Sequence, residues 1–339
     1  MQQSLAVKYR PKTWEDVVGQ KTIVSILKRQ LATNSLKNCL LFCGASGCGK
    51  TTLARILAND MNKGVGKPIE IDAASNNGVD NVREIVSQAK ERSIDGEYKF
   101  FIIDECHSIS NQGWQAFLKC IEEPPKYTIF IFCTTDPQKI PETILNRVQR
   151  FNFTRISTPE IKSRLEYVCR SEGYENYEEA TDYISKLSDG SLRMSLSMLD
   201  KCLSYSDDLS IENVLRTLGN CSYDMFFELV NAVIDDDERT VCGIVEDYYN
   251  SGSDIKQFVS QLIAFCLDME KYCLFSSMES LVVPKHYEKD VVRSTDFGGA
   301  DKYYMYVVDR LVELKGNIKF DTTPQVTVEV ALLQLARGK

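Results

Sequence analysis

A ten-residue stretch beginning at Cys43 combines residue types that suit the binding of a phosphate group. Its sequence, CGASGCGKTT, holds three glycines, one lysine and three hydroxyl side chains. It satisfies the pattern G-x-x-x-x-G-K-[ST] and follows an apolar run that predicts a buried strand. The loop is followed by apolar residues at helical spacing, Leu53, Ile56 and Leu57, which predict a helix. A strand, a glycine loop and a helix in this order predict a phosphate-binding loop rather than an ordinary glycine turn.

Each part of this loop has an expected role toward ATP. The glycines let backbone N–H groups converge on phosphate oxygens, aided by the N-terminus of the following helix. Lys50 is expected to reach the β- and γ-phosphates, and the Thr51 hydroxyl is expected to ligate Mg²⁺. The residues expected to bind the nucleotide here are Gly44, Ala45, Ser46, Gly47, Cys48, Gly49, Lys50, Thr51 and Thr52.

An acidic pair follows a second strand-like run, KFFIID. We expect Asp104 to hold Mg²⁺ through its water shell, and Glu105 to orient and deprotonate the attacking water. The second acid favours hydrolysis over nucleotide sensing alone, although both acids also suit the cap of the next helix. The letters Asp104-Glu105-Cys106-His107 match the acid box of a helicase class as well, but no second set of helicase motifs follows.

A third strand-like run, TIFIFC, is followed by Thr134 and Thr135. A polar side chain there can touch the γ-phosphate or the attacking water, although threonines are also common in turns. Strand-like and helical stretches alternate up to about Phe153, which predicts an α/β fold with a parallel sheet covered by helices. The motifs fall at the carboxyl ends of the strands, where such sheets bind ligands.

The β character largely vanishes after Ser157–Glu160, where a hydroxyl residue and a proline predict the start of a helix. We therefore expect a P-loop domain over 1–156, a small helical lid over 157–219 and an all-α domain over 220–339. The aromatic stripes of the last segment favour a core or a subunit interface over a cofactor site.

Composition limits the classes of function. The chain has 339 residues, 43% of them apolar and 26% charged, and no run long enough to predict a transmembrane helix. The first residues lack the pattern of a secretory signal, so a cytoplasmic location is expected. The 12 cysteines lack the paired spacing of zinc ligands. A net charge of −8 disfavours a free-standing nucleic-acid binder, but leaves room for one basic face.

The motifs in this order resemble the AAA+ sliding-clamp loader ATPases, and most closely the gamma/tau subunits of bacterial DNA polymerase III. The resemblance covers residues 9–200. The stretch KYRPKTWEDVVGQ is similar to the family segment that lines the adenine pocket. By that match, four residues are expected near the base: Tyr9, Arg10, Val17 and Val18.

The resemblance also implies two residues that sense the nucleotide. Thr135, in TTDPQK, occupies the position of the family's sensor-1 residue. Arg193, in GSLRMSLSMLD, occupies the sensor-2 position, which implies that it reaches the γ-phosphate. Without the resemblance, Arg193 would be interpreted as a solvated arginine on a helix.

Arg147 is expected to act on the site of a neighbouring subunit. The family has a Ser-Arg-Cys motif there, whereas this chain has Asn146 and Val148 around the arginine. The positive charge that stabilises the transition state is kept. The alternative is a surface arginine that pairs with a nearby carboxylate.

Two departures from the family change the expected ligands. The gamma/tau zinc module is replaced by the short segment NDMNKGVGKP, which has no cysteine, so no zinc is expected. The basic segment that contacts DNA is replaced by AASNNGVDNVRE, in which Asn76 and Gly78 stand at usually basic positions and Arg83 persists. DNA contact through amides and Arg83 is therefore a weaker implication.

The resemblance predicts an ATP-driven clamp-loader subunit. ATP would join such subunits, five being expected, into a ring or spiral that opens a sliding clamp and grips primer–template DNA, and hydrolysis would release the clamp. The helical C-terminal domain would form a collar. Ile109 and Trp114 are candidates for contact with the clamp.

Two alternatives come from other classes. A DNA-translocating AAA+ motor of the branch-migration helicase type would need a winged-helix module at the C-terminus, which the helical pattern there disfavours. A nucleotide-gated scaffold without turnover is disfavoured by Glu105 and Arg147.

Overall fold

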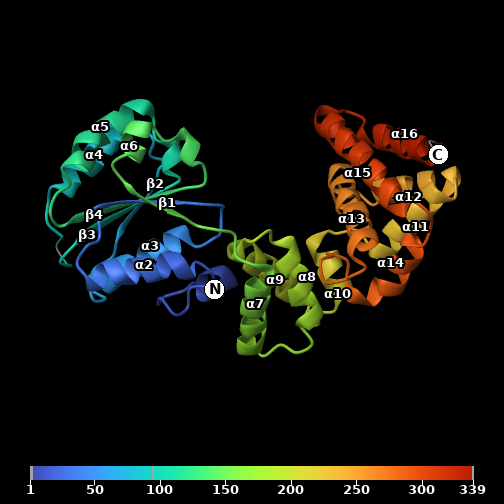
Figure 1. Cartoon of the computed structure of the whole chain (residues 1–339), viewed down its shortest axis with the longest axis horizontal. Helices are drawn as coiled ribbons and strands as arrows, with labels where there is room; N and C mark the ends of the chain where they lie inside the picture. The colour runs from blue at the N-terminus through green and yellow to red at the C-terminus, as the bar shows by residue number, and fades with distance from the viewer. Residues whose placement is uncertain (1–2, 94, 338–339) are drawn as a thin grey trace. The chain divides into compact units, whose positions relative to one another are not determined.

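The computed structural model describes residues 3–93 and 95–337, which form two compact units (Figure 1). The first unit contains the residues up to Glu172 together with Ser188–Asp200. The second contains Gly173–Leu187 and the residues from Lys201 onward. Residues of the expected lid contribute to both units, so the three-domain division stays a prediction.

The first unit is built on a parallel sheet, as the alternating pattern predicted. Five strands in the described ranges lie in the order β2-β3-β4-β1-β5, and every neighbouring pair is parallel. Their carboxyl ends therefore lie at one edge of the sheet. The strands are β1 (Cys39–Cys43), β2 (Ile69–Asp72), β3 (Lys99–Asp104), β4 (Thr128–Thr134) and β5 (Gln149–Asn152).

Helices cover both faces of this sheet because its central strands are apolar on both sides. Leu41, Phe101 and Phe130 pack with α4 and α5 on one face. Leu40 and Ile102 pack with α2 and α3 on the other. The α-helices of the first unit are α1 (Leu5–Lys8), α2 (Lys21–Ala32), α3 (Lys50–Met61), α4 (Val79–Ala89), α5 (Asn111–Glu122), α6 (Glu142–Leu145), α7 (Thr158–Glu172) and the start of α9 (Leu192–Tyr205).

The second unit is helical throughout the part that the structure describes. Aromatic side chains fill its core, where the rings of Phe226 and Phe227 lie 5.4 and 4.9 Å from that of Phe265. No helix within the described ranges is both long and apolar enough to cross a bilayer. Besides the end of α9, its α-helices are α8 (Glu178–Leu187), α10 (Ile211–Leu218), α11 (Tyr223–Ile234), α12 (Glu238–Asn250), α13 (Ile255–Phe275), α14 (Glu288–Thr295), α15 (Ala300–Asn317) and α16 (Pro324–Arg337).

The expectation that Ile109 and Trp114 contact a clamp is wrong for this conformation. Their exposed fractions are only 6% and 2%, and both belong to the core between the sheet and α4–α5. The Trp114 ring lies 5.5 Å from Phe132 and 6.0 Å from Phe117. This tryptophan supports the fold that holds the strand ends in place.

Replacement of Trp114 with alanine should lower the free energy of unfolding by about 3–5 kcal/mol, because it leaves a cavity in a close-packed core. Trp114→Phe is the matched control. It keeps an aromatic ring and removes an indole Nε1 that has no hydrogen-bond partner among the described residues, so its loss should be clearly smaller. Urea unfolding of the three proteins measures the difference. Equal losses in the two variants would contradict the packing role.

Candidate nucleotide-binding site

The glycine loop between β1 and α3 has a backbone that favours glycine at several positions, Gly47 and Gly49 among them. Gly47 has a φ of 75°, and a Cβ atom there would collide with the Ser191 hydroxyl. Gly49 has a φ of 104° and caps the N-terminus of α3, and no described heavy atom beyond its neighbours in the chain lies within 4 Å of where its Cβ would be. This leaves room for a ligand to approach the backbone amides at the start of a helix, which attract anions.

Lys50 opens α3 and lies back across the loop. It is only 6% exposed, and its Nζ donates to the backbone oxygens of Gly44 at 2.8 Å and Ala45 at 2.9 Å. Two of the predicted loop residues therefore act by holding the lysine. Carbonyl oxygens satisfy the donors of the ammonium group but do not neutralise its charge, so the charge stays available to a phosphate.

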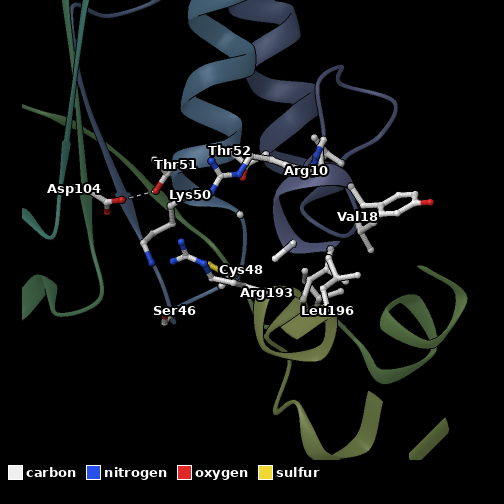
Figure 2. Close-up of a pocket in the computed structure, with 18 of the residues that line it drawn as sticks. Arg10, Val18, Ser46, Cys48, Lys50, Thr51, Thr52, Asp104, Arg193 and Leu196 are labelled. Carbon is white, nitrogen blue, oxygen red and sulfur yellow. Dashed lines mark hydrogen bonds between the residues drawn. The ribbon is translucent and has the colours of Figure 1, made fainter. Parts of the chain in front are cut away.

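Thr51 and Asp104 bring two oxygen ligands to one point, as Figure 2 shows. Thr51 Oγ1 donates to Asp104 Oδ2 over 2.7 Å, across the gap from α3 to the end of β3. Mg²⁺ prefers oxygen ligands and commonly takes one or two from the protein beside substrate phosphates and water. The pair therefore fits the expected magnesium ligands.

Glu105 is held directly beside this pair. Its backbone adopts a left-handed conformation, with a φ of 45°, as the chain turns out of β3. Its Oε2 accepts a hydrogen bond from Thr135 Oγ1 at 3.0 Å and a longer one from the Thr135 backbone N–H at 3.4 Å. The predicted sensor-1 residue thus contacts the predicted general base.

Arginine side chains add positive charge to the pocket. Arg193 extends from α9 toward the loop, and Arg10 extends from the N-terminal segment toward the start of α3 (Figure 2). Burial lowers the pKa of Arg10, and the nearby charges of Arg55 and Arg193 lower it further. Repulsion among these cations would be relieved by a polyanion such as a triphosphate.

The rest of the pocket is largely apolar and comes from the N-terminal segment, α9 and Ile156, which follows β5. The Tyr9 hydroxyl donates to Glu172, and burial together with that carboxylate raises the pKa of Tyr9 to about 12. Its hydroxyl is therefore occupied, and its ring is the part that can contact a base. The apolar lining comprises Ala6, Pro11, Val17, Val18, Ile156, Leu192 and Leu196.

Most of the predicted residues line this one pocket. Of the others, three contact lining residues and one lies outside the pocket. Gly44, Ala45 and Thr135 touch lining residues through the hydrogen bonds to Lys50 and Glu105. Arg147 lies outside. The predicted residues that line the pocket are Tyr9, Arg10, Val17, Val18, Ser46, Gly47, Cys48, Gly49, Lys50, Thr51, Thr52, Asp104, Glu105 and Arg193.

Arg147 makes the contact that the alternative interpretation named. Its Nη2 lies 2.8 Å from Glu122 Oε1 at the end of α5, and its Nη1 donates to the Thr143 carbonyl at 2.6 Å. The Arg147 side chain is 39% exposed. Action on a neighbouring subunit stays a prediction.

Sequence reasoning missed three kinds of residue. The first kind comprises Leu192, Leu196 and Pro11, which line the pocket. The two leucines lie near Arg193 at helical spacing and Pro11 belongs to the N-terminal motif, so the sequence did contain patterns that could have predicted them. His107, near Glu105, stands in the acid box but was not assigned a role. Gln20 ends the same N-terminal motif, but its hydrogen bonds from Nε2 to the carbonyls of Cys48 and Thr154 could not be predicted, because those partners are distant in sequence.

Known proteins resemble this chain in sequence over most of its length. It is 31% identical to DNA polymerase III subunit tau of Bacillus subtilis and 31% identical to subunit gamma/tau of Mycoplasma genitalium. These matches cover 99% and 92% of this chain, but 63% and 55% of the relatives. The tau subunit of Escherichia coli is 30% identical over 77% of this chain and 44% of its own length. The chain therefore spans between 44% and 63% of the length of these relatives.

Two family descriptions match parts of the chain, and solved structures match its fold. Residues 66–157 match the family described as DNA polymerase III, delta subunit, and residues 2–91 match the Rad17 P-loop domain. The Holliday junction branch migration motor RuvB of Thermotoga maritima has a TM-score of 0.53 at 18% identity, over 67% of this chain and 79% of that one. At this identity the likeness shows the fold alone, and the predicted P-loop AAA+ fold is confirmed.

Lys50→Ala should weaken ATP binding by about tenfold to a hundredfold, because it removes a charged donor from a mostly buried site. The control is Lys63→Ala, since Lys63 is exposed beyond the end of α3 and should leave binding unchanged. Titration with a fluorescent ATP analogue measures both constants. Equal affinity of the two variants would refute the phosphate contact.

Glu105→Gln should separate binding from hydrolysis. The amide keeps the shape but is a very poor base, so the hydrolysis rate should fall by about 10²–10⁴-fold while ATP affinity changes little. Single-turnover hydrolysis and equilibrium binding report the two effects. A parallel loss of both would show that Glu105 supports the pocket rather than the reaction.

Proposed function

The chain is a relative of the DNA polymerase III gamma/tau subunits, and we propose that it is an ATP-driven subunit of a DNA polymerase clamp loader. One observation carries the ATPase part of the proposal. A buried lysine, a threonine–aspartate pair and a glutamate held by a threonine lie together in one pocket beside a helix N-terminus. These groups supply charge, a metal site and a base, which phosphoryl transfer requires.

The geometry supports the following use of these residues. Lys50 and the loop amides bind the phosphates, and Arg193 approaches them from α9. Mg²⁺ held by Thr51 and Asp104 would neutralise charge on the β- and γ-phosphates. Glu105 accepts a proton from water as the water oxygen bonds to the terminal phosphorus and the bond to ADP breaks.

Arg147 is proposed to complete the site of a neighbouring subunit. It is half-exposed, so it is accessible, and its pairing with Glu122 fixes the guanidinium at the end of α5. Exposed ion pairs contribute little free energy, so exchange of Glu122 for a phosphate oxygen would cost little. ATP would then join subunits, five being expected, into a ring or spiral.

The proposed partners are a sliding clamp, primer–template DNA and other loader subunits. ATP binding would open the clamp and grip DNA, and hydrolysis would release the clamp onto DNA. Residues 220–339 of the second unit would form the collar. For DNA, the available groups are the exposed Arg83, which pairs with Asp80, and the N-terminus of α4 after Gly78.

The branch-migration motor is a weaker candidate. The RuvB structures share the fold at 18–19% identity, whereas the curated gamma/tau relatives share 30–34% identity and match up to 99% of the chain. The second unit also contains only helices among its described residues, and a winged-helix module contains strands.

The decisive test measures ATPase activity of the assembled protein with and without its sliding clamp and primed DNA. Joint stimulation by both is expected, whereas stimulation by duplex alone with strand displacement would favour the motor. Arg147→Ala should reduce the stimulated rate by about a hundredfold or more, as loss of an arginine finger does. Arg150→Ala, which changes a nearby exposed arginine, is the matched control.

A mixing experiment then tests action between subunits. Lys50→Ala subunits keep Arg147, and Arg147→Ala subunits keep a working pocket, so assemblies that mix the two should recover part of the rate. Absence of any recovery in mixed assemblies would contradict the proposed contact across the interface.

A further inference from the structure

We propose that His107 is a positioning residue for Glu105, which fixes the orientation of the base carboxylate relative to the phosphate loop. The inference rests on the proposed ATPase function and deepens it. Its observation is separate from the motifs that predicted the function, because no role was derived for the fourth letter of the acid box.

His107 Nδ1 lies between two groups at the edge of the sheet. It is 3.2 Å from Glu105 Oε2 and 3.1 Å from the hydroxyl Oγ1 of Thr134. Thr134 is fully buried at the end of β4, and the next residue, Thr135, contacts the same Glu105 oxygen. The Glu105 carboxylate is therefore held through Oε2 from two sides, and Oε1 remains to accept the water proton.

The charge of Glu105 decides which imidazole nitrogen carries the proton. An ionised carboxylate oxygen only accepts, so a lone pair on Nδ1 at 3.2 Å would be repelled by it. The Nδ1–H form is attracted by Glu105 and donates to Thr134 Oγ1. That hydroxyl oxygen also accepts from the Asp136 backbone N–H at 3.0 Å, so Thr134 is fixed in turn.

Thr134 connects this contact to the phosphate loop. Its backbone oxygen accepts a hydrogen bond from the N–H of Gly44, the first loop residue, at 3.1 Å. Thr134 also pairs in register with Cys43 at the end of β1. His107 thus ties the base to the strand end from which the loop starts, and such alignment is worth large factors in rate.

The side chain is placed to orient Glu105 and contributes little to the core. His107 is 18% exposed and is outside both core clusters of the sheet. Its loss should therefore spare folding and nucleotide affinity and reduce the rate of hydrolysis.

Three variants of the whole chain in its assembly test this. His107→Ala should lower kcat by about tenfold to a hundredfold, with ATP affinity and melting temperature nearly unchanged. His107→Asn should recover most of the rate, because its amide N–H takes the place of Nδ1–H. His286→Ala changes the other histidine of the chain, which lies in the second unit, and should have no effect.

A double-mutant cycle with Glu105→Gln shows whether His107 acts through Glu105. Single-turnover hydrolysis should fall at least about tenfold on adding His107→Ala to the wild type, and less than about twofold on adding it to Glu105→Gln. Equal factors in both backgrounds, or no recovery by asparagine, would overturn the inference.

The other possible results also test the inference, and they separate its failure from failure of the proposed function. If His107→Ala loses ATP affinity or melts early in proportion to its rate, the residue supports the fold and the inference is wrong. If the wild type hydrolyses ATP and His107→Ala matches it, the inference alone fails. If the wild type hydrolyses no ATP with clamp and DNA present, the proposed function fails and the inference fails with it.

Discussion

The parallel register of β3, β4 and β1 is the constraint on which the site depends. It places Asp104, Thr134 and Cys43 at one edge, so the proposed metal ligand, the threonine pair and the glycine loop meet without any long connection. The hydrogen bond from Gly44 N–H to Thr134 O closes this edge. Both faces of these strands are buried under helices, and a one-residue slip would move every motif away from its partner.

Much of the site was predictable because its signals are local. The glycine loop has left-handed backbone at Gly47 and Gly49 immediately before a helix. All the residues that specify this conformation lie within eight consecutive positions, so the sequence alone predicts it. The strands were predictable for the same reason, because a short apolar run bounded by polar residues is typical of a buried strand. The alternation of strand and helix then specified a parallel sheet.

The contacts that sequence reasoning missed or misjudged depend on which elements become neighbours. The contact of His107 with Thr134 spans 27 positions and exists only because β3 pairs with β4. A pairing of Arg147 with a carboxylate was one of the two interpretations that the sequence offered, but the partner Glu122 could not be named, because the pair needs α5 and α6 to lie together. For Trp114 the periodic apolar face is the better guide, because Phe117 and Ile121 follow it at helical spacing and all three are buried, whereas the resemblance implied an exposed contact.

The pocket also explains how a chain with a net charge of −8 can suit a triphosphate. Field strength at a site depends on nearby charges in a poorly solvated environment, and distant carboxylates on the surface are screened by salt. Lys50, Arg10 and Arg193 all line the pocket, whereas its carboxylates, Asp104 and Glu105, are engaged by hydroxyl donors. Burial lowers the pKa of Arg10, and the charges of Arg55 and Arg193 lower it further, which records the cost of placing a cation at this position. That cost is recovered when an anion binds, so the structure concentrates its attraction for phosphate where the reaction would occur.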